Sequence, residues 1–596
     1  MKCIDLKELN NDFKCKIDTL EGNAEVLVKR GDDFSEVFIY ADYMGAYGTG
    51  ERFNTINQKG RKCINQVKEQ FCNQGDNTYL SIPFFITDAG FGVFVDTKIV
   101  SEFDFKKDIT IKCSNESNIY FFTGQPKEII KEFNSLLGGP IETPPRFAFG
   151  PWVSANHWKS EADVRRVREE LKKYDFPATV MVLEAWSDEA TFYIFNGAKY
   201  EAKPDGIAFT YDDFDFSESE YWNNPRKMIE ELKSDGIELV LWQIPVFKQM
   251  DEGEYSLQND LDAKDAIKSR NCVFNNDGTP YRIPKGNWFE GSLIPDFTNE
   301  ETERKWFNKR QYLLDIGVAG FKTDGGEFIY KDELVFANGD TGREQRNAYA
   351  QTYVDSYKRF IGNNRILFSR AGYTGAQRTP FVWAGDHLST NEELKHAYYS
   401  AISAANSGIL YWGFDIGGFA GPLPTKDVYL RSTQFACFCP VMQWHSEPDG
   451  GQFREIMPGA EGNNERSPWN IAAIYNDETY LDEIRYWHKL RMRLLPYIYK
   501  QATVSAQSGI PMMRSLFWED SMNKELISWT EEYYFGEDLL VAPLLEENQC
   551  SREVYLPKGN WIGFFSGEIY EGSSLISSEK EKFPVFIKQG KESEFY

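Results

Sequence analysis

Hydrophobic and polar positions change their pattern twice along the chain. Up to about residue 140, short runs of β-branched and aromatic residues are bounded by Gly, Asp and Asn, as at 25–28, 37–40 and 91–95. Such runs are typical of strands joined by turns. Pro144 and Pro145 then interrupt the pattern, and paired prolines make a rigid turn at a domain boundary. We therefore expect an N-terminal antiparallel β-sandwich over residues 1–143.

Apolar strand-like runs alternate with charged amphipathic stretches in the middle of the chain. The predicted strands are residues 178–183, 237–244, 318–321, 366–369, 381–383 and 409–412. The predicted helices between several of them are residues 161–173, 225–234 and 300–314. This alternation predicts an α/β fold, a parallel (β/α)8 TIM barrel over residues 144–505. Strand-like runs return at 538–543 and 553–557, so residues 506–596 are expected to form a C-terminal β-sandwich domain.

Charge and cysteine content restrict the partners and the compartment. The 596 residues carry a formal net charge of −25, which argues against nucleic acid and anionic membrane as partners, because their phosphates need a basic surface. The nine cysteines are odd in number and form no Cys-x-x-Cys pair, so free thiols in a reducing compartment are expected. Residues 1–8 have no signal-peptide core, and no run approaches the roughly 20 apolar residues that span a membrane. We expect a cytoplasmic protein, and the sequence leaves a homo-oligomer open.

Two aspartates stand at the ends of predicted barrel strands. Residues 320–328 (GFKTDGGEF) are an apolar run that reaches Asp324 and then turns through Gly325 and Gly326. Residues 381–387 (FVWAGDH) are a second apolar run, which reaches Asp386. Active sites of α/β barrels lie at the C-terminal ends of the strands, and a pair of carboxyl groups, one ionised and one protonated, is what glycoside cleavage requires. The alternative interpretation is a capped strand end with surface charge.

Four further segments carry a family resemblance together with these two. They are residues 47–53 (YGTGERF), 144–150 (PPRFAFG), 296–299 (DFTN) and 535–543 (FGEDLLVAP). In order and spacing the chain resembles glycoside hydrolase family 31, the retaining α-glycosidases that include α-glucosidases and α-xylosidases. The resemblance implies that Asp324 is the nucleophile and Asp386 the general acid/base.

The resemblance also implies a set of sugar-binding residues. They are Glu184, with Trp186 beside it, and Lys322, Arg370, Trp383, Phe419 and His445. Trp242 and Trp288 are added as aromatic walls for sugar stacking, with a structural role as the alternative for either. Alternative interpretations are that Arg370 only neutralises a buried acid, that Trp383 is core and that His445 is a hydrogen-bonded core histidine. Small Ala185 leaves room for the hydroxymethyl group of glucose, whereas bulky Trp186 beside it would fill the same space.

The resemblance therefore predicts an exo-acting retaining α-glycosidase that removes terminal α-linked glucose from short oligosaccharides. The alternatives are an α-xylosidase, which the Lys-Thr-Asp form before Gly325 resembles, an α-galactosidase-type enzyme, a transglycosylase and, remotely, an inactive sugar-binding protein. No cofactor or metal is expected. The five histidines form no His-Glu-x-x-His motif, and the sequence has no phosphate-binding loop and no Gly-x-Ser-x-Gly elbow.

Overall fold

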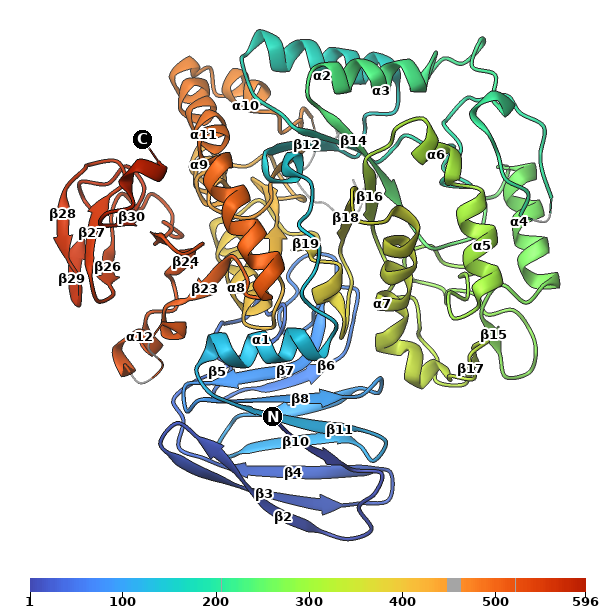
Figure 1. The fold of residues 1–596 in the computed structure, drawn as a ribbon. Helices are drawn as coiled ribbons and strands as arrows, with labels where there is room; N and C mark the ends of the chain where they lie inside the picture. The colour runs from blue at the N-terminus through green and yellow to red at the C-terminus, as the bar shows by residue number, and fades with distance from the viewer. Residues whose placement is uncertain (205, 447–461, 520, 522, 596) are drawn as a thin grey trace.

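The computed structural model describes residues 1–204, 206–446, 462–519, 521 and 523–595. Figure 1 shows three parts: blue antiparallel sheets at the N-terminus, a central parallel barrel with helices around it, and a red sheet at the C-terminus. This arrangement confirms the predicted fold class.

The N-terminal part consists of two antiparallel sheets that share one core. Their strand orders are β1-β11-β8-β7-β5 and β2-β3-β4-β10-β9-β6. In β3 and β4 every second residue is buried, and inward residues such as Val26, Val28, Val37 and Ile39 pack into the core between the sheets. The bounds are β1 Lys2–Asp5, β2 Phe13–Thr19, β3 Gly22–Arg30, β4 Phe34–Tyr40, β5 Ala46–Gly50, β6 Lys62–Asn65, β7 Ser81–Thr87, β8 Phe91–Asp96, β9 Ser101–Asp104, β10 Ile109–Ser114 and β11 Asn118–Thr123.

Helix α1 (Pro126–Leu136) leads from this part to a barrel of parallel strands in the order β20-β19-β18-β16-β14-β13-β12-β22-β21. Only Phe414 separates β20 from β21, so these two segments form one interrupted strand, and the barrel closes with eight strand positions. The bounds are β12 Pro151–Ala155, β13 Val180–Leu183, β14 Glu238–Gln243, β16 Gly320–Thr323, β18 Ile366–Ser369, β19 Phe381–Trp383, β20 Tyr411–Gly413, β21 Asp415–Ile416 and β22 Met442–Ser446.

The helices around the barrel begin at local capping signals. Helix α2 (Glu161–Lys173) starts after Ser160, whose side chain accepts from the backbone N–H of Asp163, and α3 (Pro225–Ser234) starts after the cap Asn224. The predicted helix 300–314 is two helices, α5 (Glu300–Asn308) and α6 (Gln311–Asp315). The other helices are α4 Leu257–Lys268, α7 Gly342–Ile361, α8 Asn391–Ala405, α9 Lys426–Cys437, α10 Pro468–Ile474 and α11 Glu478–Ser508. A two-residue ladder also pairs β15 Phe274–Asn275 with β17 Leu334–Val335.

The C-terminal part is a six-stranded sheet in the order β23-β24-β25-β30-β27-β28 with a separate β26-β29 ladder. Helix α11 lies between this sheet and the barrel (Figure 1). The bounds are β23 Met513–Ser515, α12 Lys524–Ser528, β24 Tyr533–Phe535, β25 Leu539–Val541, β26 Glu553–Leu556, β27 Asn560–Gly563, β28 Ile569–Glu571, β29 Ser574–Ser577 and β30 Val585–Lys588.

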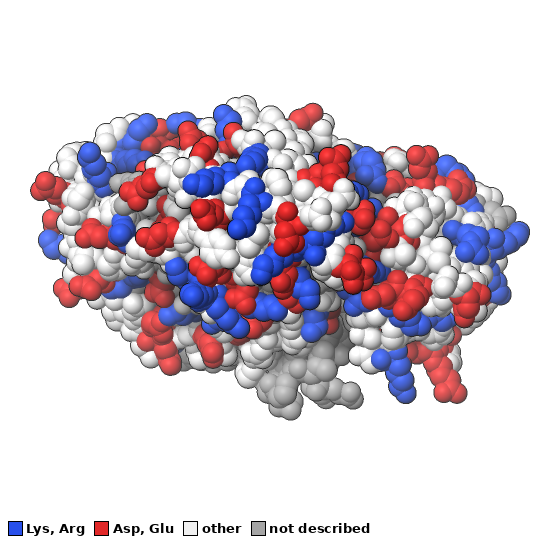
Figure 2. Space-filling view, turned by 90° about the horizontal axis from the view of Figure 1, so that it is seen from below, with Lys and Arg blue, Asp and Glu red and all other residues white. Residues whose placement is uncertain are grey.

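The surface carries charges of both signs, and the cysteines are unpaired. Figure 2 shows acidic and basic side chains intermingled over one face of the molecule. Within the described ranges, no helix is both long and apolar enough to cross a membrane. All nine cysteines are free thiols.

Candidate active site

A cavity of about 550 Å³ opens at the C-terminal ends of the barrel strands. Its polar lining includes Asp324, which follows β16, Arg370, which follows β18, and Asp386, which lies beyond the end of β19. Because parallel strands end at the same edge of the barrel, residues far apart in the sequence meet here.

Three donors hold the carboxylate of Asp324. The indole Nε1 of Trp242 donates to Oδ2 at 2.9 Å, the backbone N–H of Gly325 donates to Oδ1 at 2.8 Å, and Nε of Arg370 lies 3.1 Å from Oδ1. Gly325 has φ of +68°, and a Cβ there would lie 2.6 Å from Cδ1 of Ile244. Glycine therefore fits the turn that presents Asp324 without strain.

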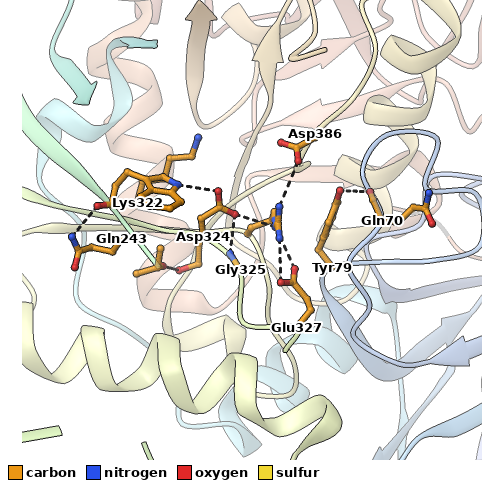
Figure 3. Close-up of polar contacts among 12 residues, drawn as sticks. Gln70, Tyr79, Gln243, Lys322, Asp324, Gly325, Glu327 and Asp386 are labelled. Atoms are coloured by element: carbon orange, nitrogen blue, oxygen red, sulfur yellow. Dashed lines mark hydrogen bonds and ion pairs between the residues drawn. The ribbon is translucent and has the colours of Figure 1, made fainter. Parts of the chain in front are cut away.

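Arg370 connects three carboxyl groups, those of Asp324, Glu327 and Asp386, which Figure 3 labels. Its Nε and Nη2 donate to the two carboxylate oxygens of Glu327, each at 3.2 Å, and Nη1 lies 3.5 Å from Oδ2 of Asp386. The guanidinium carbon lies 4.7 Å from the ring centre of Tyr79 and 5.2 Å from that of Trp288. This buried cation is thus balanced by carboxylates and fixed between two rings. It both neutralises acids and fixes Asp324 and Asp386 relative to each other.

Asp386 has the environment of a protonated acid. Burial raises its pKa above the usual range of a carboxyl group, Arg370 opposes the rise, and the negative charge of Asp324 adds to it. Its side chain still exposes 17% of its surface, so a ligand in the cavity can reach the carboxyl group. The amide Nε2 of Gln74 donates to the backbone carbonyl of Asp386 at 2.5 Å. The N-terminal part of the chain therefore helps to hold the acid in place.

An ion pair lies deeper in the cavity. Nζ of Lys322 is 2.5 Å from Oε1 of Glu184 and 4.5 Å from the ring centre of Trp383. Nδ1 of His445 lies 3.7 Å from the same Glu184 oxygen and 2.9 Å from Oγ of Ser154. Burial lowers the pKa of Lys322, but the carboxylates, with Glu184 first, outweigh it and hold the pKa above its usual range. Lys322 therefore stays charged and fixes Glu184 toward the cavity.

The structure brings most of the predicted site residues to one cavity. Its lining includes Glu184, Trp242, Trp288, Lys322, Asp324, Arg370, Asp386 and Phe419. Trp383 and His445 are buried behind this lining, in contact with Lys322 and Glu184.

Trp186 lies elsewhere. It is fully buried, donates from Nε1 to the carbonyl of Trp242 at 3.0 Å and packs on Phe195. Ala185 and Trp186 lie in the turn that follows β13, and it is Ala185 that lines the cavity. The sequence left open whether small Ala185 or bulky Trp186 faces the ligand space, and in the structure Ala185 does so.

Several site residues were not predicted. The cavity lining also includes Glu69, Phe71, Asn156, Glu189 and Phe289, while Glu327, Gln74 and Tyr79 support the acids from behind. For Glu327 a signal existed, because it is the only other carboxyl residue in the 320–328 segment. The others lie in irregular loops, where no periodic pattern marks them.

Comparison with family models matches all three parts of the chain. Residues 141–501 match the glycosyl hydrolases family 31 TIM-barrel domain. Residues 509–591 match the family 31 C-terminal domain, and residues 20–104 match the family 31 N-terminal galactose mutarotase-like domain.

Curated and solved proteins give named relatives. Isomaltosyltransferase from Sporosarcina globispora is 37% identical over 91% of this chain, which spans only 50% of that enzyme. The 1,3-alpha-isomaltosidase of Kribbella flavida is 33% identical over 92% of this chain and 76% of its own length. The cycloalternan-degrading enzyme from Trueperella pyogenes, solved with a covalent intermediate, superposes with a TM-score of 0.88 at 31% identity over 95% of this chain and 79% of its own.

Proposed function

The chain belongs to glycoside hydrolase family 31, and on that basis we propose that it is an exo-acting retaining α-glycosidase of short α-glucosyl oligosaccharides. The observation that carries the proposal is the pair Asp324 and Asp386, both bound by Arg370 in one cavity. One member is held by three donors and the other has a raised pKa. Such a difference in environment assigns separate roles to two carboxyl groups.

In the proposed reaction, the carboxylate of Asp324 attacks the anomeric carbon while Asp386 donates its proton to the leaving oxygen. The glycosidic bond breaks, and a covalent glycosyl-enzyme remains. Asp386, now ionised, takes a proton from the incoming water, which displaces Asp324 and restores both groups. Two inversions at the anomeric carbon leave its configuration unchanged. The covalent intermediate in the Trueperella pyogenes enzyme supports this route.

Glucose is the proposed sugar at the point of cleavage. Ala185 faces the cavity and leaves room for a hydroxymethyl group, and Glu184 offers a fixed carboxylate to sugar hydroxyls. The α-xylosidase and α-galactosidase-type activities are the alternatives. Transfer of the glycosyl unit to a second sugar is a further candidate, which the isomaltosyltransferase favours, since an acceptor hydroxyl can replace water in the second step.

Three broader expectations also stand as proposals. They are a cytoplasmic location, supported by nine free thiols, assembly as a homo-oligomer, and division of the chain at residues 143/144 and 505/506. The family-model limits of 141–501 and 509–591 support these boundaries.

Hydrolysis of p-nitrophenyl α-glucoside, α-xyloside and α-galactoside tests the proposed activity. We expect turnover of the α-glucoside with the α-anomer as the first product by NMR. Asp324→Ala and Asp386→Ala should lower kcat by roughly four orders of magnitude for a disaccharide substrate, whereas the surface variant Asp277→Ala should not. A β-anomer as first product, or an active Asp324→Ala enzyme, would contradict the proposal.

A further inference from the structure

A second recess adjoins the catalytic cavity. It has a volume of about 370 Å³ and lies between residues 248–251, beyond β14, and the 287–292 segment. Trp288 and Phe289 line both this recess and the catalytic cavity. The two spaces are therefore neighbours on either side of one aromatic pair.

Two ionisable side chains flank this aromatic pair. Glu189 lines the catalytic cavity and Lys248 lines the recess. Lys248 is the cation that opposes the rise in the pKa of Glu189 caused by burial, so the two groups are within electrostatic reach. Among the residues that the structure describes, neither the Glu189 carboxylate nor the Lys248 ammonium makes a hydrogen bond or an ion pair. One acceptor and one donor are thus available to a ligand.

The backbone around this junction is unusual. Glu189, Phe192 and Phe289 have φ of +53°, +57° and +58°, a region that residues other than glycine seldom adopt. The ring of Phe192 lies 5.7 Å from that of Phe289 and 5.6 Å from that of Trp242. Strained residues that persist in a packed structure cluster at sites that clamp ligands.

The strand order places this junction away from the leaving group. Asp386, which protonates the leaving oxygen, follows β19, whereas Glu189 follows β13. These strands are four positions apart in a barrel of eight positions, so their loops lie on opposite sides. The recess therefore extends the cavity on the non-reducing side of the bond that is cleaved.

We propose that Glu189, Lys248 and the Trp288–Phe289 pair form a subsite for a second sugar on the non-reducing side. This inference rests on the proposed glycosidase function and refines its substrate. Glu189 accepts from sugar hydroxyls, Lys248 donates to them, and an aromatic face packs against the C–H face of the ring. The enzyme then releases or transfers a disaccharide unit instead of a single glucose.

Paired aryl glycosides test the subsite. The substrates are p-nitrophenyl α-glucoside and the p-nitrophenyl α-glycosides of isomaltose, nigerose and maltose. We expect one aryl disaccharide to exceed the glucoside at least tenfold in kcat/KM and to release the intact disaccharide. Lys248→Met and Glu189→Gln should each lower the ratio of the two kcat/KM values about tenfold. Lys285→Met, an exposed lysine in the preceding turn, should leave the ratio unchanged.

Each other outcome has a defined meaning. Release of glucose before any disaccharide, with a ratio that no variant changes, overturns the subsite while the glycosidase function stands. If Lys248→Met changes only the KM of an acceptor sugar, the assignment of the subsite to the non-reducing side is overturned. If the wild-type protein hydrolyses none of the substrates, the proposed function fails. Calorimetric titration with isomaltose then tests the subsite. An equal affinity for isomaltose in the wild type and in Lys248→Met overturns the subsite, whereas a tenfold loss of affinity in the variant supports it.

Discussion

At the scale of single residues, the charge on Arg370 is shared among three carboxyl groups. Glu327 takes two hydrogen bonds from it, and Asp324 and Asp386 each take one contact. Arg370 lowers the pKa of Asp386, against the rise caused by burial. The carboxylate of Glu327 offsets part of this positive field, although it does not line the cavity. It is therefore a positioning residue that also influences the proton on Asp386.

Replacing Glu327 with Gln should move the alkaline limb of the pH profile. The substitution removes a negative charge beside Arg370, so the net positive field on Asp386 increases and its pKa falls. Because the proposed role of Asp386 as the acid requires a proton on it, activity should then be lost at lower pH than in the wild type. The measurement is kcat/KM for a disaccharide from pH 4 to 9. A profile that keeps its shape and only decreases in height would mean that Glu327 is merely structural.

At the scale of elements, local signals determined what the sequence could predict. The bounds of α2 and α3 were predicted correctly because Ser160 and the Asn224-Pro225 pair mark their first turns. Six of the eight barrel strand positions were found because they are short apolar runs, whereas β12 and β22 were not predicted. The two aspartates were found because they follow such runs. By contrast, the predicted helix 300–314 breaks near Arg310, whose Nε donates to Oε1 of Gln243 in the barrel at 2.6 Å. That contact is tertiary, and no local pattern shows it.

The same limit applies to the residues that complete the site. Glu189 and Phe289 reach the cavity through left-handed backbone in irregular loops, and Gln74 and Tyr79 come from the N-terminal part. Their positions depend on packing between distant segments, not on periodicity. Trp186 shows the converse case, in which a residue next to the correct one points into the core.

The turn that carries Asp386 depends on Gly385. This residue has φ of +69°, and a Cβ there would overlap the ring of Tyr79. Gly385→Ala should displace the acid, and a displacement of about 1 Å costs roughly a hundredfold in rate. The loss should be larger for a disaccharide than for p-nitrophenyl α-glucoside, because nitrophenolate leaves with little help from an acid. The kcat/KM values for both substrates measure it.

Gly278→Ala is the matched control for this turn. Gly278 has φ of +82°, but a Cβ there would meet no atom within 4 Å. Both variants carry the backbone strain of a left-handed alanine, and only Gly385→Ala adds the clash at the acid. Equal losses in the two variants, or equal losses for the two substrates, would show that the turn does not position Asp386.

At the scale of the whole molecule, the N-terminal part is built into the catalytic barrel. Leu80 forms a parallel bridge with Gly372, just beyond β18, and the backbone N–H of Gly50 donates to Oγ of Ser407 at 2.8 Å. Glu51 is buried in the same contact and accepts from Nε1 of Trp412, in β20, at 2.8 Å. The sheets and the barrel therefore share buried polar contacts, and we expect them to unfold together.

Glu51 makes the stability of this contact depend on pH. Burial raises its pKa to about 8, and the hydrogen bond from Trp412 opposes the rise. An unfolded Glu titrates at about 4.3, so between these values the unfolded chain gives up a proton that the folded protein keeps. The free energy of unfolding contributed by Glu51 is therefore fully present below about 4.3 and falls as pH rises toward about 8.

Glu51→Gln should remove this dependence, because the amide does not titrate and its oxygen can still accept from Trp412. The thermal midpoint of the variant minus that of the wild type should then be more positive at pH 8 than at pH 5, by about 2 °C or more. Scanning calorimetry at one heating rate measures this difference. The control is Glu36→Gln, on the exposed face of β4, and its difference in thermal midpoint from the wild type should not depend on pH. The difference isolates Glu51 because the other titrating groups are common to both proteins. If the difference in thermal midpoint between Glu51→Gln and the wild type were the same at both pH values, Glu51 would be ionised in the folded protein. A buried negative charge would then have to be balanced at the contact between the sheets and the barrel.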